Sequence, residues 1–189
     1  MAIVTEPKPS AEPTDAASSA AETPRLTGAR AVIAHLRERR PLMQRTAEAR
    51  HQFIRAAGPL IEAVRRGEAD DFARRADTAG VEAVAVFRFV RERLGELVVP
   101  LPCSGCHESF VAWVDLLVVS AETMLHASKT DDPTRLREIE SLFAEGRTFS
   151  ARFKAQYEPL VNQIKERSAA RKEQRGRLTR FLSGSKRGA

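Results

Sequence analysis

The sequence is poor in the residues from which sheets and compact active sites are commonly built. Only 6% of its 189 residues are aromatic, it contains two cysteines and four histidines, and its β-branched residues form no strand-like runs. It has no Gly-rich phosphate loop, no nucleophile elbow and no H-E-x-x-H motif. These absences argue against a β-sheet fold and against the common nucleotide-binding, hydrolase and metalloprotease classes. We therefore expect a protein that is not an enzyme.

Long apolar runs are also missing. The first residues, MAIVTEPKPSAEP, do not combine a basic segment with an apolar one, as a secretory signal does. No uninterrupted apolar stretch reaches the roughly 18 residues that a membrane-spanning helix needs. We expect a cytoplasmic protein without a transmembrane segment, and in that compartment cysteines are usually reduced thiols, ligands or redox groups.

Alanine, leucine, arginine and glutamate are abundant, a composition that favours helices. Residues 1–26 depart from it, because four prolines stand there among alanine, serine, threonine and glutamate. Such a segment has too few large apolar side chains to offset the entropy lost on ordering. We predict that it is a disordered leader.

After this leader, apolar residues recur at spacings of three and four, the pattern of amphipathic helices. Proline, glycine and capping residues divide the pattern into four helices, over about residues 27–66, 70–98, 105–129 and 132–164. Pro41 is expected to break the first, because proline lacks an N–H and its ring clashes with the preceding turn. Four such helices joined by short connections predict an all-α fold, an antiparallel four-helix bundle.

Local signals mark several of the expected helix ends. Gly67 is a typical C-terminal stop, and Ser104 is placed to cap the third helix. Asp132-Pro133 combines a capping residue with proline at the first helical position, so it predicts the start of the fourth helix.

The segment Cys103-Ser-Gly-Cys106-His107 has the spacing C-x-x-C-H. In that motif two thiols attach a haem and the adjacent histidine ligates its iron. In these five residues, and nowhere else, the chain resembles c-type cytochromes. The resemblance would imply covalent haem bound by Cys103, Cys106 and His107.

The same residues support three other hypotheses. They could form a redox dithiol, because a cap at Ser104 would place Cys106 in the first helical turn, where the helix dipole favours a thiolate. They could bind zinc, with Cys103, Cys106 and either His107 or His126 among the ligands of a tetrahedral site. The simplest interpretation, which we favour, is that the cysteines are small buried residues beside a capping turn.

The net charge of +6 is unevenly distributed along the chain. Residues 165–189 hold nine Lys/Arg against two Glu, a net charge of +7, so residues 1–164 sum to −1. Clustered cations of this kind contact phosphates of nucleic acid, anionic membrane surfaces or acidic grooves of proteins, and they also keep a protein soluble. The residues expected to contact a partner are Arg171, Lys172, Arg175, Arg177, Arg180, Phe181, Lys186 and Arg187.

The sequence thus predicts a non-catalytic interaction or scaffold module whose basic C-terminal extension, residues 165–189, contacts an anionic or protein partner. Self-association into a homo-oligomer is compatible with the same pattern. The alternative hypothesis is a redox, haem or zinc protein centred on the CSGCH segment.

Overall fold

The computed structural model of the chain describes residues 28–68 and 70–184, with side chains up to residue 174. Within these residues there are four long α-helices and no β-strand, so the predicted all-α class is confirmed. The helices are α1 (Ala29–Arg65), α2 (Phe72–Gly95), α3 (Ser104–Thr130) and α4 (Leu136–Gly184), with two 3-10 turns, η1 (Leu101–Cys103) and η2 (Pro133–Arg135). The predicted leader, residues 1–26, lies outside the described residues.

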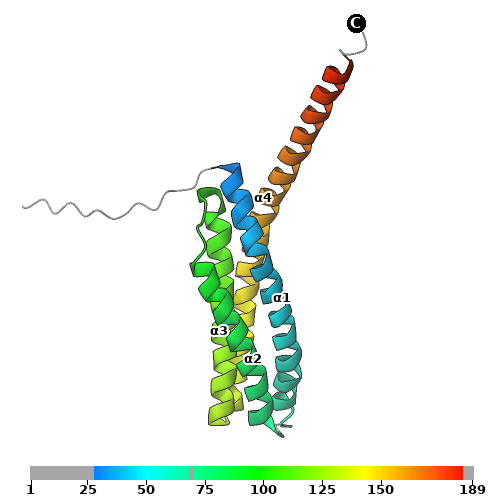
Figure 1. Ribbon diagram of the computed structural model, residues 1–189. Coiled ribbons are helices and arrows are strands. Elements are labelled where there is room, and N and C mark those ends of the chain that lie inside the picture. Colours follow the sequence, from blue (N-terminus) through cyan, green and yellow to red (C-terminus); the bar gives the residue numbers. More distant parts are fainter. Residues whose placement is uncertain (1–27, 69, 185–189) are drawn as a thin grey trace, which may run out of the picture.

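The four helices lie alongside one another, and the two connections of α2 lie at opposite ends of the molecule (Figure 1). α3 packs along α2 and along α4, whereas α1 packs mainly on α2 and contacts α4 sparsely. At 1.5 Å per residue, α4 with its 49 residues is about 74 Å long and α3 with its 27 residues about 40 Å. The C-terminal part of α4 therefore extends beyond its neighbours (Figure 1).

Most helix ends follow the local signals in the sequence. Gly67 adopts φ 74°, a left-handed conformation that glycine reaches without steric penalty, and α1 ends just before it. Asp132 accepts a hydrogen bond from the Thr134 N–H at 3.1 Å, and Pro133 begins η2, which leads into α4. Ser104 does not cap α3 as predicted: it is the first residue of the helix, and its hydroxyl donates to the Leu101 carbonyl oxygen at 2.9 Å.

The predicted break near Pro41 is absent, because α1 is continuous across it. Pro59 in α1 and Pro159 in α4 are likewise inside uninterrupted helices. A helical proline leaves the carbonyl four residues earlier without its usual partner. All three prolines are exposed, and so are the residues that carry those carbonyls, Arg37, Arg55 and Ala155. Water can reach these carbonyls, so the cost of each proline is reduced.

The fourth helix runs past residue 164, the predicted end of the bundle, into the basic extension, which the sequence predicts to be helical or flexible, with helix to about Arg175 and an interruption at Gly176. The interruption is absent, because α4 continues through Gly176 to Gly184. A single glycine in a helix costs only about 1 kcal/mol relative to alanine, and most of its neighbours here are good helix formers. The side chains of residues 165–174 are all exposed.

Apolar side chains form two clusters along the length of the molecule. The first cluster lies toward the α1–α2 connection, and the second toward the α2–α3 connection. The first includes Phe53, Leu60, Phe72, Phe87, Met124 and Ile139, and the second includes Val32, Leu36, Val90, Leu94, Cys103, Cys106, Phe110, Val114 and Phe153. Between them, the two clusters draw on all four helices and fix how the helices pack.

One segment, Leu101–Thr130, is long and apolar enough to span a membrane by length and composition alone. It contains no uninterrupted apolar run of that length, because polar residues are scattered through it. A core helix has the same composition, and α3 packs against both α2 and α4. In this structure 39% of the apolar window is buried inside the molecule.

Candidate functional site

The two cysteines lie where η1 leads into α3. Pro100 is extended, with φ −63° and ψ 144°, and its carbonyl oxygen accepts a hydrogen bond from the Cys103 N–H at 2.8 Å. Residues three apart in a helical turn share one face, and here that face is buried. Cys103 is 0% and Cys106 2% exposed, and both are free thiols.

A buried arginine of α1, Arg39, hydrogen-bonds to Cys106. Arg39 is 0% exposed, and its Nη2 donates to the Cys106 carbonyl oxygen at 2.6 Å while Nη1 donates to Sγ at 3.2 Å. Its guanidinium carbon lies 4.8 Å from the ring centroids of both Phe110 and Phe153, where aromatic faces attract a cation. Among the described residues no carboxylate pairs with Arg39, and burial lowers the pKa of its guanidinium.

Two histidines lie beside this arginine. His35 of α1 is 2% exposed, its Nδ1 donates to the Val98 carbonyl oxygen at 3.1 Å, and its ring centroid is 5.7 Å from that of His107. His35 Nε2 and His107 Nδ1 are buried without a hydrogen-bond partner among the described residues. We call His35, Arg39, Cys103, Cys106 and His107 the Arg39 cluster.

Burial and positive neighbours keep both imidazoles neutral. Burial, followed by the Arg39 charge, lowers the pKa of His35 and lowers that of His107 to about 4. The pKa of the Cys103 thiol is raised to about 11 by burial and by Cys106. The cluster thus holds one cation, Arg39, among groups that are mostly neutral at neutral pH.

We predict that stability falls in acid because of His107. Folded His107 takes up its proton only near pH 4 and the unfolded residue near pH 6.5, so the unfolded state binds more protons between these values. The free energy of unfolding should drop by roughly 2 kcal/mol as the pH falls from about 6.5 to 4, after allowance for solvent screening. The titratable and charged groups that act on His107 are His35, Arg39 and Arg91. The control variant, His107→Gln, keeps all three of them.

Urea titrations of both proteins at several pH values measure this contribution. Wild type should lose stability relative to His107→Gln over that range. Parallel pH profiles of the two proteins would contradict a depressed pKa at His107.

The predicted zinc ligands are not all brought together. His126 follows His107 on the same helix by 19 residues, which corresponds to about 29 Å along its axis. In the part of the chain that the structure describes, no three His, Cys, Asp or Glu side chains group closely enough to hold a metal ion. The predicted third helix, about residues 105–129, already contained both histidines, so its length alone separates them from a common site.

Cys103, Cys106 and His107, the predicted haem ligands, do lie together, but as part of the Arg39 cluster. Both sulfur atoms are sealed from solvent, and that of Cys106 already accepts a hydrogen bond from Arg39. A redox or haem role would therefore require this end of the molecule to open. Both cysteines are thus buried, as the simplest interpretation of the sequence expects, and the Cys106 thiol is hydrogen-bonded.

Sequence reasoning missed His35 and Arg39. The signal was present, because Arg39 falls at helical spacing between Leu36 and Met43, on the apolar face of α1. An arginine on such a face would have been a candidate for burial. Its partners on α3 and α4 could not be identified without the packing of the helices.

The predicted partner-binding residues lie on or beyond the projecting end of α4. Arg171 and Lys172 are exposed. The backbone of residues 175–184 is helical, but the side chains of Arg175, Arg177, Arg180 and Phe181 lie outside the described set, as do Lys186 and Arg187 altogether.

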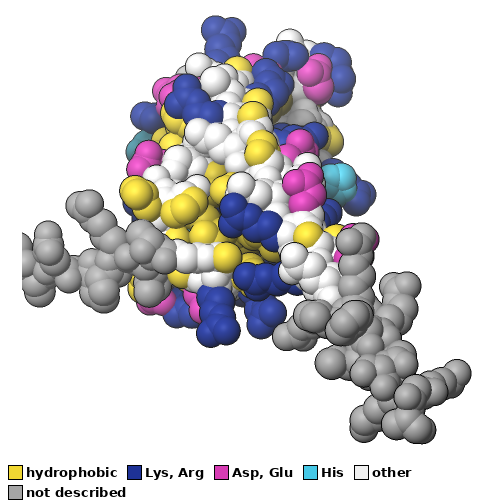
Figure 2. Space-filling view, turned by 90° about the horizontal axis from the view of Figure 1, so that it is seen from above, with side chains coloured by type: hydrophobic (Ala, Val, Ile, Leu, Met, Phe, Trp, Pro, Cys, Tyr) yellow, Lys and Arg dark blue, Asp and Glu magenta, His cyan; other side chains and the backbone are white. Residues whose placement is uncertain are grey.

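Exposed apolar residues occur at the same end of the molecule. Val98 and Leu101, in the α2–α3 connection, are 51% and 62% exposed. Viewed from that end, hydrophobic side chains gather in patches, with Lys and Arg distributed around them (Figure 2). A surface of this kind combines apolar contact area with positive charge.

No protein family model matches the chain, and neither does any curated protein or any solved structure. Function is therefore inferred from the residues of this chain alone.

Proposed function

We propose that the protein is an antiparallel four-helix bundle that works as a non-catalytic interaction module, with the projecting end of α4 as its contact element. One observation supports this most directly: ten consecutive side chains, residues 165–174, are exposed although the helix continues beyond them to Gly184. Helices gain most of their stability from packing, and isolated ones of modest length are marginal in water. A helix presented in this way is stabilised when a partner covers it.

The chemistry of the extension favours an anionic partner surface. Residues 165–189 carry a net charge of +7, and the rest of the chain is close to neutral. In the sequence, Leu178, Phe181 and Leu182 recur at helical spacing among the arginines, as in helices that bind through both charge and apolar contact. The partner surface would be anionic with an apolar strip, whether it belongs to a protein, a nucleic acid or a membrane.

The exposed connection between α2 and α3 supports a second point of contact. Val98 and Leu101 belong to the end of the molecule from which α4 projects, since Leu97 and Val99 pack in the same cluster as Leu160 and Ile164. A partner that lies along α4 would meet these two side chains at its base. The alternative, a redox, haem or metal protein that uses the CSGCH segment, has no comparable support because its thiols are buried under Arg39.

A chain that ends at residue 164 tests the proposal. The truncated protein should melt within about 2 °C of the full chain, because the removed side chains described here are exposed. Its affinity for a short DNA duplex, for phosphatidylserine vesicles or for an acidic polypeptide should fall at least about tenfold, since phosphate and carboxylate contacts would be lost. Fluorescence anisotropy and vesicle co-sedimentation at two salt concentrations measure both effects and separate the three partner classes.

A matched pair of charge variants controls for nonspecific electrostatics. The triple change of Arg171, Lys172 and Arg175 to Gln should weaken binding nearly as much as truncation. The same change at Arg37, Arg40 and Arg55, which are exposed on α1, removes equal charge and should leave binding largely intact. Equal losses from the two triple variants, or unfolding of the truncated chain, would contradict the proposal.

A further inference from the structure

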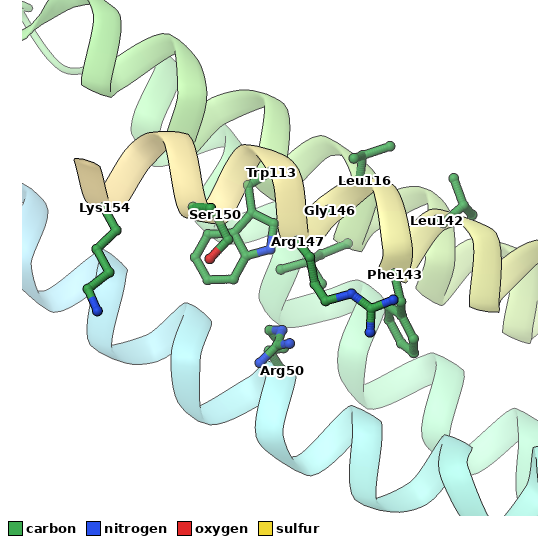
Figure 3. Close-up of a pocket in the computed structure, with 11 residues that line it drawn as sticks. Arg50, Trp113, Leu116, Leu142, Phe143, Gly146, Arg147, Ser150 and Lys154 are labelled. Carbon is green, nitrogen blue, oxygen red and sulfur yellow. The ribbon is translucent and has the colours of Figure 1, made fainter. Parts of the chain in front are cut away.

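A pocket of about 250 Å³ opens between α1 and α4, where these two helices contact each other sparsely. Its apolar part is formed by Trp113, Leu116 and Leu117 of α3 and by Leu142 and Phe143 of α4. Figure 3 shows the Trp113 indole lying between α4 and α1, with Phe143 farther along the same space. The proposed contact element at the end of α4 makes no use of this pocket.

Three cations line the same pocket. Arg50 reaches toward it from α1, and Arg147 and Lys154 extend from α4 (Figure 3). Among the described residues neither Arg50 nor Arg147 forms an ion pair, and Lys154 has only Glu158, 3.7 Å away in an exposed pair on the next turn. Exposed pairs of this kind contribute little, and the guanidinium carbon of Arg50 lies 6.0 Å from the Trp113 ring centroid, so these cations meet an aromatic face and no close carboxylate other than Glu158 among the described residues.

Two further features concern the edge of the Trp113 indole. Gly146 lines the pocket, and a Cβ atom at that position would come within 3.5 Å of Trp113 Cδ1 and 3.7 Å of Nε1. The absence of a side chain there leaves the indole edge open. Its Nε1–H forms no hydrogen bond with the described residues, so a donor is left near the arginines.

We infer that this pocket binds a small amphipathic organic anion, with its apolar body against Trp113 and Phe143 and its acidic group near Arg50 and Arg147. An apolar wall with a few convergent polar groups is the usual composition of a small-molecule site. Arginine is suited to the acidic group because its planar fork meets a carboxylate with two parallel hydrogen bonds.

Because the chain has a single tryptophan, the fluorescence of Trp113 reports directly on this pocket. The probes are octanoate and 4-phenylbutanoate, each paired with its neutral counterpart, octan-1-ol and 4-phenylbutanamide. Both anions should bind saturably with a Kd on the order of 100 µM, and the neutral compounds at least about fivefold more weakly. A preference between the two anions shows whether an aliphatic or an aromatic body fits.

Three variants of the full chain make the test specific. Arg147→Gln should weaken binding of the anions about five- to tenfold and leave the neutral compounds unchanged, whereas Arg137→Gln, exposed on the same helix outside the pocket, should change neither. Gly146→Leu should abolish binding of all four compounds, and circular dichroism would show that the variant still folds, since leucine is the better helix former. Equal binding of anions and neutral compounds, equal effects of the two arginine changes, or no saturable signal would overturn the inference.

Discussion

Replacing Arg39 with alanine should lower the free energy of unfolding by about 3 kcal/mol, one of the two largest effects expected of a single change in this protein. The guanidinium packs against both rings of the Phe110–Phe153 pair and hydrogen-bonds to Cys106, and alanine would leave the place of the guanidinium empty. The Cys106 carbonyl oxygen would also lose a charged donor in a buried setting. Urea denaturation followed by circular dichroism measures the change.

The variant Arg39→Met separates the contribution of side-chain packing to stability from that of the charge and its hydrogen bonds. Arg39 carries its desolvation cost without a carboxylate partner among the described residues, and Nε has no hydrogen-bond partner there either. Replacing a buried charged group by an apolar one of similar length is often neutral or stabilising. Arg39→Met should therefore stay within about 1 kcal/mol of wild type. A loss as large as that of alanine would show that the hydrogen bonds to Cys106 are the main contribution.

Gly80→Val should also be strongly destabilising, by about 3 kcal/mol, because α2 and α3 approach closely at this glycine. A Cβ atom at Gly80 would lie 2.9 Å from the backbone nitrogen of Leu125 and 3.0 Å from its Cβ. Backbone cannot move aside as the end of a flexible side chain can. Gly80→Ala should lose about 1–2 kcal/mol although alanine is the better helix former.

Gly58→Ala is the matched control for that pair. Gly58 is also inside a helix, but a Cβ atom there would have nothing within 4 Å. The substitution should change the free energy of unfolding by no more than about 0.5 kcal/mol, because the gain in helix propensity is offset by the clash of an alanine Cβ with the ring of Pro59, the next residue. Chemical denaturation of the three variants under identical conditions makes the comparison. A gain in stability from Gly80→Ala would contradict the close approach of α2 to α3.

The sequence was sufficient for the class of fold and for the approximate positions of the helices. Periodicity in apolar residues identifies amphipathic helices directly, and Gly67 and Asp132 mark chain reversals by local chemistry. The break at Pro41 was wrong because the cost of a helical proline depends on whether the freed carbonyl meets water. That exposure is a property of the packed molecule, which residue types alone do not report.

For the candidate sites, too, the sequence identified residues within one helix but not the contacts between helices. The CSGCH spacing identified three of the five residues in the Arg39 cluster, and the helical spacing around Leu36 would have identified Arg39. The spacing could not show which aromatic rings contact the Arg39 guanidinium, because Phe110 and Phe153 belong to two other helices. The pocket beside Trp113 was also beyond reach, since it depends on the gap between α1 and α4.

Amide hydrogen exchange of the full chain, alone and with a bound partner surface, tests the central claim most directly. Residues 165–184 should exchange much faster than residues 104–130 in the isolated protein, since neighbouring helices cover only the second segment. Addition of the anionic surface that binds best should slow exchange in residues 165–184 and leave α3 unchanged. Protection of residues 165–184 in the isolated monomer, or protection on binding that appears elsewhere, would contradict the assignment of this segment as the contact element.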